Sequence, residues 1–167
     1  MKTRGMTRCA LMAALMAVCA WISVPVGDSA VSLQTFAVFF ALGVLGGRAG
    51  TAACVVYLCI GAVGVPVFTG FRGGIGVLLG PTGGYLWGFL LAALGYWFLE
   101  GRMPRWLTMA LGMAVCYACG TAWYYLAYAG GGLWAVILQC VVPYLIPDAI
   151  KISLALMLTD RVKGYRT

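Results

Sequence analysis

The sequence contains no histidine, and only four of its 167 residues are acidic. Histidine is a common metal ligand and the usual proton-transfer group near neutral pH, so its absence argues against a metal centre and against most enzymes. Charged residues make up 9% of the chain, whereas hydrophobic residues make up 63%. So few charges cannot supply the polar surface that a soluble domain of this length needs. We therefore expect residues 1–167 to form a single all-α domain embedded in a lipid bilayer.

Motifs typical of three other functions are also missing or misplaced. The run GPTGGYLW (80–87) lacks the Lys-Ser/Thr ending with which a P-loop contacts phosphate and magnesium. The net charge of +7 is not gathered into a basic helix or a basic–aromatic stripe, as nucleic-acid binding would require. The run CYAC (116–119) lies within an apolar segment, where a thiolate is costly, so its cysteines are expected to pack rather than react. Neither nucleotide hydrolysis, nucleic-acid binding nor redox chemistry is indicated.

Long apolar runs predict six membrane-spanning helices, because about 17–25 apolar residues are needed to cross the hydrocarbon core. Proline removes a backbone donor and crowds the preceding turn. Pro143 and Pro147 are therefore expected to separate a short helix, 133–142, from a last span that begins at Pro147. The predicted spans are 9–25, 31–46, 49–66, 82–99, 104–128 and 147–161.

The basic residues predict how these spans are oriented. With a cytoplasmic N-terminus, nine of the eleven basic residues fall in cytoplasmic segments, one falls in an outer loop and one falls within a span. This asymmetry is the positive-inside pattern. Both termini are therefore predicted to be cytoplasmic, with the short helix 133–142 in the last outer loop.

The N-terminal thirty residues also fit a second interpretation. A basic start, an apolar centre and small residues at 27–30 resemble a secretory signal peptide, whose removal would leave five spans. However, Ala10 and Ala14 lie four residues apart, as do Ala13 and Ala17, and this spacing lets two helices approach closely in lipid. The spacing favours a retained helix, because a cleaved leader has no use for such a face.

Asp148 and Lys151 are the residues that a membrane helix tolerates least. They lie three residues apart in IPDAIKISLAL (146–156), on one face of the last predicted span. Ionisable groups inside a membrane cost at least ~2.5–3.5 kcal/mol on insertion scales and usually face a cavity or a partner. The pair is either a structural salt bridge that only fixes the helix, or a site that binds a ligand. As a ligand site, an acceptor beside a donor suits a cyclic urea or amide.

A glycine-rich connection precedes the fourth predicted span. The segment GVPVFTGFRGGIGVLLGPTGG has eight glycines among 21 residues and is nevertheless partly apolar. A long loop in so short a chain is usually functional or disordered, and its apolar content argues against disorder. Glycine lets backbone N–H groups approach a ligand closely. We expect this segment to wall a cavity that opens outward.

Four runs of residues are similar to the BioY family. They are SLQTFAV (32–38), GGRAG (46–50), YLCIGAVGVPVFTGFRGGIGVLLGPTGGYLWGF (57–89) and PDAIK (147–151). BioY proteins are the biotin-specific substrate-binding (S) components of energy-coupling-factor (ECF) vitamin transporters. The resemblance implies a multi-pass protein of the prokaryotic cell (plasma) membrane, with six helices and both ends cytoplasmic. It also implies binding and uptake of biotin from outside, and no enzymatic activity.

The resemblance further implies partners. An S component works with a membrane scaffold (T) subunit and two ATPase subunits, so ATP is used only by the partners, and no cofactor or metal is expected in this chain. In S components an Ala-x-x-x-Ala motif on the first helix contacts the scaffold subunit. Ala10 and Ala14 resemble that motif.

Biotin has a ureido ring, a thiophane ring and a valerate tail, and each part suggests candidate residues. Asp148 would accept from a ureido N–H, and Lys151 would donate to the ureido oxygen or to the carboxylate. Arg72, the other cation outside the cytoplasmic segments, would steer or hold the carboxylate. The remaining candidates are Gln34 and Thr35 as hydrogen-bond partners, Gly74 in the glycine-rich segment, and Phe68, Phe71, Tyr85 and Trp123 as apolar and aromatic walls.

Three alternatives stay open at this point. The closest is an S component for a different vitamin, because the fold would be shared and the pocket would differ. An intramembrane enzyme would have only Asp148 and Lys151 as catalytic groups. A channel would need a polar stripe that the apolar spans do not supply.

Overall fold

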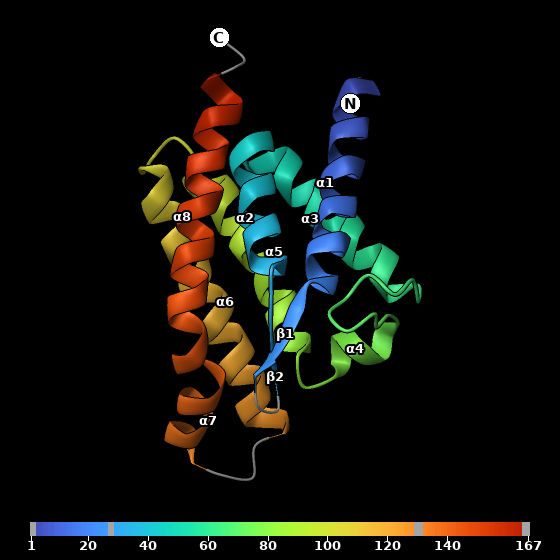
Figure 1. Ribbon diagram of the computed structural model, residues 1–167, viewed down its shortest axis with the longest axis vertical. Helices are drawn as coiled ribbons and strands as arrows, with labels where there is room; N and C mark the ends of the chain where they lie inside the picture. Colours follow the sequence, from blue (N-terminus) through green and yellow to red (C-terminus); the bar gives the residue numbers. More distant parts are fainter. Residues whose placement is uncertain (1–2, 27–28, 129–131, 165–167) are drawn as a thin grey trace.

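The chain is described here by a computed structural model that covers residues 3–26, 29–128 and 132–164 (Figure 1). Helices account for most of these residues, and a short hairpin of two antiparallel strands follows the first helix. In chain order the elements are α1 (Thr3–Trp21), β1 (Ser23–Val26), β2 (Ser29–Ser32), α2 (Gln34–Leu45), α3 (Gly47–Ala62), α4 (Ile75–Leu79), α5 (Gly83–Leu99), α6 (Arg105–Ala127), α7 (Leu133–Cys140) and α8 (Val142–Gly164).

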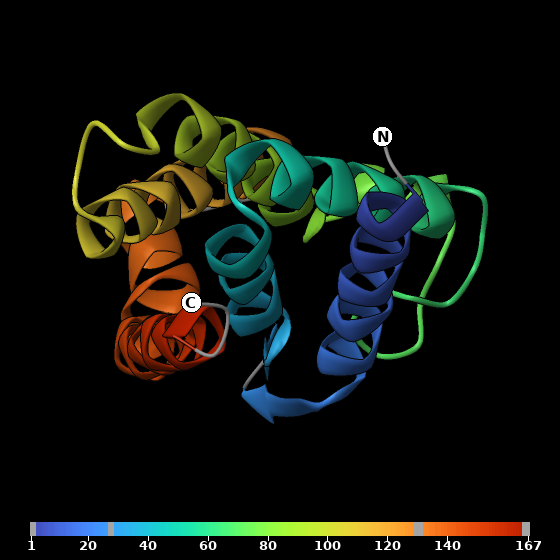
Figure 2. The same cartoon turned by 90° about the horizontal axis from the view of Figure 1, so that it is seen from above.

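The six longer helices form a bundle of two rows. Seen from above, α1, α2 and α8 lie in one row and α3, α5 and α6 lie in the other (Figure 2). The first turn of α1 and the last turn of α8 lie at the same end of the bundle (Figure 1). The hairpin, α4 and α7 gather at the opposite end, where they surround the site described below.

The α5–α6 contact is the most extensive in the bundle, and glycine makes it close. A Cβ added at Gly84 of α5 would lie 2.3 Å from Cβ of Trp123 and 3.1 Å from the carbonyl oxygen of Cys119, both on α6. A Cβ added at Gly120 would lie 2.3 Å from the ring of Tyr85. The two helices therefore approach along faces that lack side chains, and this sets where the Tyr85 ring stands.

Replacing Gly84 with Ala is expected to lower the free energy of unfolding by about 1–3 kcal/mol, because overpacking forces the helices apart. Gly95, on the same helix, is the matched control, since a Cβ there would meet nothing within 4 Å. Gly95→Ala is expected to be neutral or stabilising by up to about 1 kcal/mol through its better helix propensity. Thermal unfolding in detergent measures both variants, and equal effects would contradict the close-contact account.

The exterior of the bundle carries large apolar side chains. Leu11, Phe98 and Ile146 are 65%, 69% and 75% exposed. Among the described residues, two stretches are long and apolar enough to cross a membrane, Arg105–Ala127 and Val136–Gly164, and Gln34–Leu45, Gly47–Ala62 and Gly83–Leu99 are shorter apolar helices. An apolar exterior on an all-helical bundle fits a lipid environment, as the composition predicts.

Several boundaries differ from the sequence predictions, and the third helix, α3, ends at Ala62 rather than at residue 66. The first helix begins at Thr3 and ends at Trp21, so residues 23–25 of the predicted first span lie in β1 instead. Residues 31–32 lie in β2, which the prediction of a helix over 31–46 missed. Hydrophobicity does not separate strand from helix in so short a stretch, whereas the β-branched residues Val24 and Val31 favour an extended chain. The glycine-rich segment also contains a short helix, α4.

The separate helix predicted over 133–142 is confirmed as α7, but the predicted start of the last helix is wrong. Helix α8 begins at Val142, and Pro147 lies inside it. Pro143 stands in the first turn, where a backbone N–H needs no helical partner. Pro147 then costs one backbone bond, to the carbonyl of residue 143, without ending the helix. This places Asp148 and Lys151 in the second and third turns of α8.

Candidate ligand-binding cavity

A cavity of about 700 Å³ opens among the hairpin, α2, the segment 68–82, α5, α6 and the start of α8. Cavities of roughly 300–1,000 Å³ are typical of small-molecule sites. Most of its lining residues belong to elements at the end of the bundle opposite the first turn of α1 and the last turn of α8 (Figure 1). Seven of the ten predicted ligand contacts line it: Gln34, Thr35, Phe68, Arg72, Tyr85, Asp148 and Lys151.

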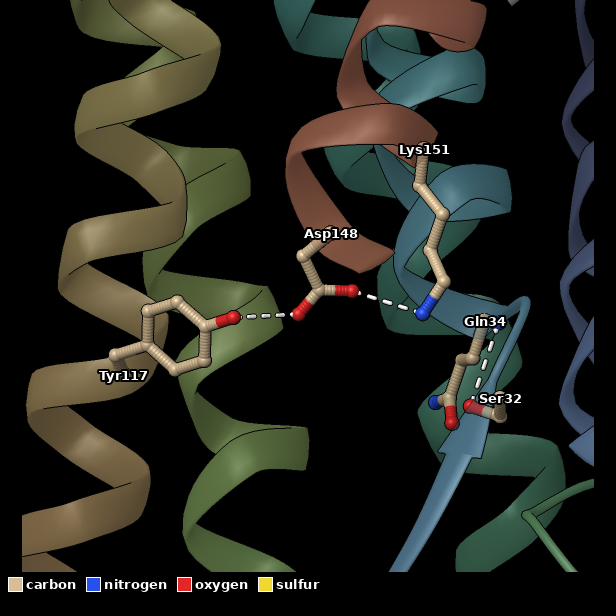
Figure 3. A network of polar contacts seen from close by, with 5 residues as sticks. All are labelled: Ser32, Gln34, Tyr117, Asp148 and Lys151. Atoms are coloured by element: carbon tan, nitrogen blue, oxygen red, sulfur yellow. Dashed lines mark hydrogen bonds and ion pairs between the residues drawn. The ribbon is translucent and has the colours of Figure 1, made fainter. Parts of the chain in front are cut away.

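Asp148 and Lys151 form an ion pair within this cavity (Figure 3). Lys151 Nζ donates to Asp148 Oδ1 at 2.8 Å, and the lysine and aspartate side chains are only 8% and 6% exposed. Tyr117 of α6 donates its hydroxyl to Asp148 Oδ2 at 2.6 Å. A carboxylate has about four lone-pair sites and an ammonium has three donors, so both groups keep capacity for a ligand.

Gln34 adds a polar group from α2 to the same cavity. The residue is 4% exposed, and its Oε1 accepts from Thr69 Oγ1 at 3.2 Å. Its backbone N–H donates to Ser32 Oγ at 3.4 Å (Figure 3). Its Nε2 has no hydrogen-bond partner among the described residues. A buried unsatisfied donor costs about 1–3 kcal/mol, so this amide N–H group is suited to an acceptor atom on a ligand.

Aromatic side chains form much of the remaining wall. Phe68 is 1% exposed, and its ring occupies the space that the missing Cβ of Gly61 leaves. Tyr85 donates its hydroxyl to the carbonyl of Cys140 at 3.1 Å, which joins α5 to α7. Phe89 and Tyr144 also line the cavity. Rings of this kind offer flat apolar surface to a ligand that has apolar parts.

Three tyrosines that the sequence prediction missed line the cavity, Tyr117 and Tyr124 of α6 and Tyr128 directly after it. They stand seven and four residues apart, which places them on one face of a helix. This spacing is visible in the sequence and was the available signal. Tyr117 is the most important of the three, because its hydroxyl contacts the Asp148 carboxylate.

Three of the predicted contacts lie outside the cavity lining. Phe71 is 64% exposed and stacks on Trp21 with ring centroids 5.0 Å apart. Gly74 has φ +96° and donates its N–H to the carbonyl of Gly61 at 2.7 Å, which shapes the start of α4. Trp123 donates its indole N–H to the carbonyl of Gly80 at 3.1 Å. Gly74 and Trp123 thus hold the glycine-rich segment in place, whereas Phe71 lies on the outside.

The end of α4 is held in place by side chains from two other helices. The carbonyl oxygens of Leu78 and Gly80 accept from Trp87 and Trp123, and the carbonyl of Leu79 accepts from Tyr128. Carbonyls at a helix end have no helical partner, so these bonds satisfy them. They fix the segment whose residues Val77, Pro81 and Thr82 line the cavity.

Arg72 brings a positive charge to the cavity from the exposed loop. Its backbone pairs with that of Phe68, with the N–H of Phe68 donating to the carbonyl of Arg72 at 2.9 Å. Its guanidinium makes no ion pair with any other described residue. The charge is therefore available to an anionic group near the cavity.

The alanines of α1 divide between two faces. Ala13 and Ala17 are buried against the bundle, whereas Ala10 and Ala14 are exposed. The exposed pair therefore belongs to a narrow face that is free to pack against another helix.

A helical bundle with an apolar exterior and a cavity lined by a buried ion pair is typical of membrane proteins that have a small-molecule site. Residues 1–166 match the model of the BioY family, and the chain belongs to that family. The resemblance found in the four sequence runs is thus confirmed.

Two relatives agree with this assignment, and one solved structure shares the fold. The chain is 40% identical over 164 residues to the probable biotin transporter BioY of Pyrococcus horikoshii, covering 98% of this chain and 99% of that protein. It is 37% identical over 164 residues to the biotin transporter BioY of Thermotoga maritima, covering 96% of each. The fold is similar to the crystal structure of the S-component for biotin from an ECF-type ABC transporter, with a TM-score of 0.88, 24% identity, and coverage of 98% of this chain and 92% of that one.

Proposed function

We propose that the chain binds biotin in this cavity and serves as the S component of an ECF-type transporter that takes biotin up from outside the cell. The observation that carries the proposal is the buried Asp148–Lys151 pair, which lines a 700 Å³ cavity in a member of the BioY family. Relatives that match almost the whole chain are named as biotin transporters. A transporter component of this kind binds and releases its ligand unchanged, so the chain is not an enzyme.

The ureido ring of biotin matches the polar groups of the cavity. It carries two N–H donors and one carbonyl acceptor. Asp148 accepts from an N–H, while Lys151 donates to the carbonyl oxygen. Gln34 lines the same cavity, and its side-chain amide nitrogen, which has no hydrogen-bond partner in the described part of the chain, supplies a second donor. Charge-assisted bonds of this kind are the stronger ones, and a site out of water strengthens them further.

The other parts of biotin match the remaining residues that line the cavity. Phe68, Tyr85 and Phe89 line the cavity and pack against the thiophane ring and the aliphatic chain. Arg72 is the basic group in the exposed loop, so it attracts or holds the terminal carboxylate. The ureido ring then meets the Asp148–Lys151 pair and the carboxylate meets Arg72, so the ligand has one direction in the cavity.

The partners in this proposal are a membrane scaffold subunit and two ATPase subunits, and the solved structure similar in fold belongs to an ECF-type ABC transporter. ATP is hydrolysed only by those partners, and the chain itself uses no cofactor or metal. The exposed pair Ala10 and Ala14 on α1 forms the contact with the scaffold subunit.

We further propose six spans, with both termini on the cytoplasmic side of a prokaryotic plasma membrane. Supporting this, the first turn of α1 and the last turn of α8 lie at one end of the bundle, and Arg161 and Lys163 stand in that last turn of α8 (Figure 1). Arg72 lies in the loop at the other end. A basic excess at one end is the positive-inside pattern.

Cysteine labelling in intact cells tests this topology. In a background without the native cysteines, a thiol replacing Val63, which is 86% exposed, is expected to react with a membrane-impermeant maleimide. A thiol replacing Met103, which is 41% exposed at the other end, is expected to react only after the cells are opened. Labelling of the Met103 variant in intact cells would overturn the six-span arrangement.

Uptake of radiolabelled biotin tests the function. Cells that lack their own biotin uptake are expected to accumulate the label when they express this chain together with scaffold and ATPase subunits. A tenfold excess of unlabelled biotin should abolish accumulation, whereas riboflavin or thiamine should not. Accumulation of another vitamin in place of biotin would show an S component of different specificity.

A further inference from the structure

We infer that Tyr117 is a positioning residue for ligand binding, which acts through Asp148 rather than on the ligand itself. Its hydroxyl donates to Asp148 Oδ2 at 2.6 Å, while Lys151 donates to Oδ1 at 2.8 Å (Figure 3). The inference rests on the proposed function, since it assigns Asp148 to the ligand's N–H group.

An aspartate carboxylate can rotate unless both of its oxygens are held. The terminal torsion of an aspartate is broad, so one hydrogen bond leaves the carboxylate plane able to swing. Lys151 lies on α8 itself, three residues after Asp148, and holds one oxygen only. Tyr117 lies on α6 and holds the other oxygen from across the cavity. Two donors on two elements fix the plane, and the remaining lone pairs then keep one direction.

Tyr117 is itself suited to hold that oxygen. Its ring packs against the buried core, and a tyrosine has only two side-chain torsions to fix. Without the hydroxyl, both carboxylate oxygens would be free to turn toward the Lys151 ammonium. The ion pair would survive that change, but the acceptor would no longer be aimed at a ligand. A positioned acceptor binds more tightly than a mobile one, because less ordering is needed on binding.

The test is a double-mutant cycle on biotin affinity, measured with purified protein. Tyr117→Phe is expected to weaken binding about tenfold, a loss of about 1.4 kcal/mol. Tyr125→Phe is the matched control, because Tyr125 lies on the same helix, is 39% exposed, stands outside the cavity lining and makes no side-chain hydrogen bond with a described residue. Its affinity is expected to stay within twofold of the parent. The melting temperature of each variant monitors folding.

The cycle separates positioning from packing or direct contact. In protein that already carries Asp148→Asn, the further change Tyr117→Phe is expected to alter the affinity by less than twofold, since the group it positions is gone. An unchanged tenfold loss in that background would overturn the inference, and so would a Tyr117→Phe variant with parental affinity. If Asp148→Asn alone leaves biotin binding unchanged, the proposed site fails instead, and the two failures are distinguishable.

Discussion

Replacing Asp148 with Asn is expected to weaken biotin binding about ten- to a hundredfold. The carboxylate offers a charge-assisted hydrogen bond in a cavity that is largely out of water, worth roughly 1.5–3 kcal/mol, and each tenfold change corresponds to about 1.4 kcal/mol. Asparagine keeps the shape but replaces a pure acceptor with a group that is half donor. Lys151→Met keeps the length of the side chain and removes the donor, with a similar expected loss. Equilibrium binding to the purified variants measures both.

Each single substitution also leaves the other charged residue of the pair without its partner. Breaking a buried ion pair from one side costs about 3–5 kcal/mol of stability, because an uncompensated charge is left in place. Asp148 and Lys151 are both under 10% exposed, so lower melting temperatures are expected for both single variants. Weaker binding by a single variant therefore does not by itself distinguish a ligand site from a structural salt bridge.

The double variant Asp148→Asn with Lys151→Met makes that distinction. Replacing a buried pair with neutral residues of similar size is often neutral for stability, so this protein is expected to melt near the parent. If the pair binds the ligand, the stable double variant does not bind biotin. Near-parental affinity in the double variant would show that the pair is a structural salt bridge and does not bind the ligand.

Replacing Ala10 and Ala14 together with Leu is expected to abolish biotin uptake in cells while purified protein still binds biotin. Both alanines are exposed on α1, and leucine there keeps another helix from approaching closely. No residue of α1 is among those that line the cavity, so the substitution does not reach it. Uptake of labelled biotin and equilibrium binding are the two measurements.

The chain supplies a matched control for this prediction. Ala110 and Ala114 of α6 are also four residues apart and exposed. Leucine at both positions adds the same bulk to a different face and is expected to leave uptake intact. If the α6 variant loses uptake as well, or if the α1 variant retains it, the face of α1 is ordinary surface rather than the contact with the scaffold subunit.

Much of the fold could be predicted from the sequence, because long apolar runs leave few alternatives to helices in lipid. The helix predicted over 82–99 matches α5, and that over 104–128 matches α6, within a residue. The hairpin after α1 was missed, since its apolar residues continue the hydropathy of the helix. Pro147 was read as a helix start, because its local preference is visible in sequence while the packing that keeps α8 continuous is not.

Some residues of the candidate site could also be predicted from the sequence, and others could not. Asp148 and Lys151 were identifiable because ionisable residues in an apolar segment are rare and costly. Trp123 was expected to wall the cavity, yet its indole N–H holds the carbonyl of Gly80. Which face of an aromatic residue meets a cavity depends on how its helix is rotated in the bundle, and hydropathy does not fix that rotation. Tyr117 was missed for the same reason, although its spacing to Tyr124 marks one face of α6.

Equilibrium binding of radiolabelled biotin to the purified chain tests most directly whether the cavity between α2, α6 and α8 binds biotin. Saturable binding at one site is expected, displaced by unlabelled biotin and not by riboflavin or thiamine. The stable double variant Asp148→Asn with Lys151→Met is expected to show no saturable binding. Absence of saturable binding to the parent protein, or equal displacement by the other vitamins, would contradict biotin binding in this cavity.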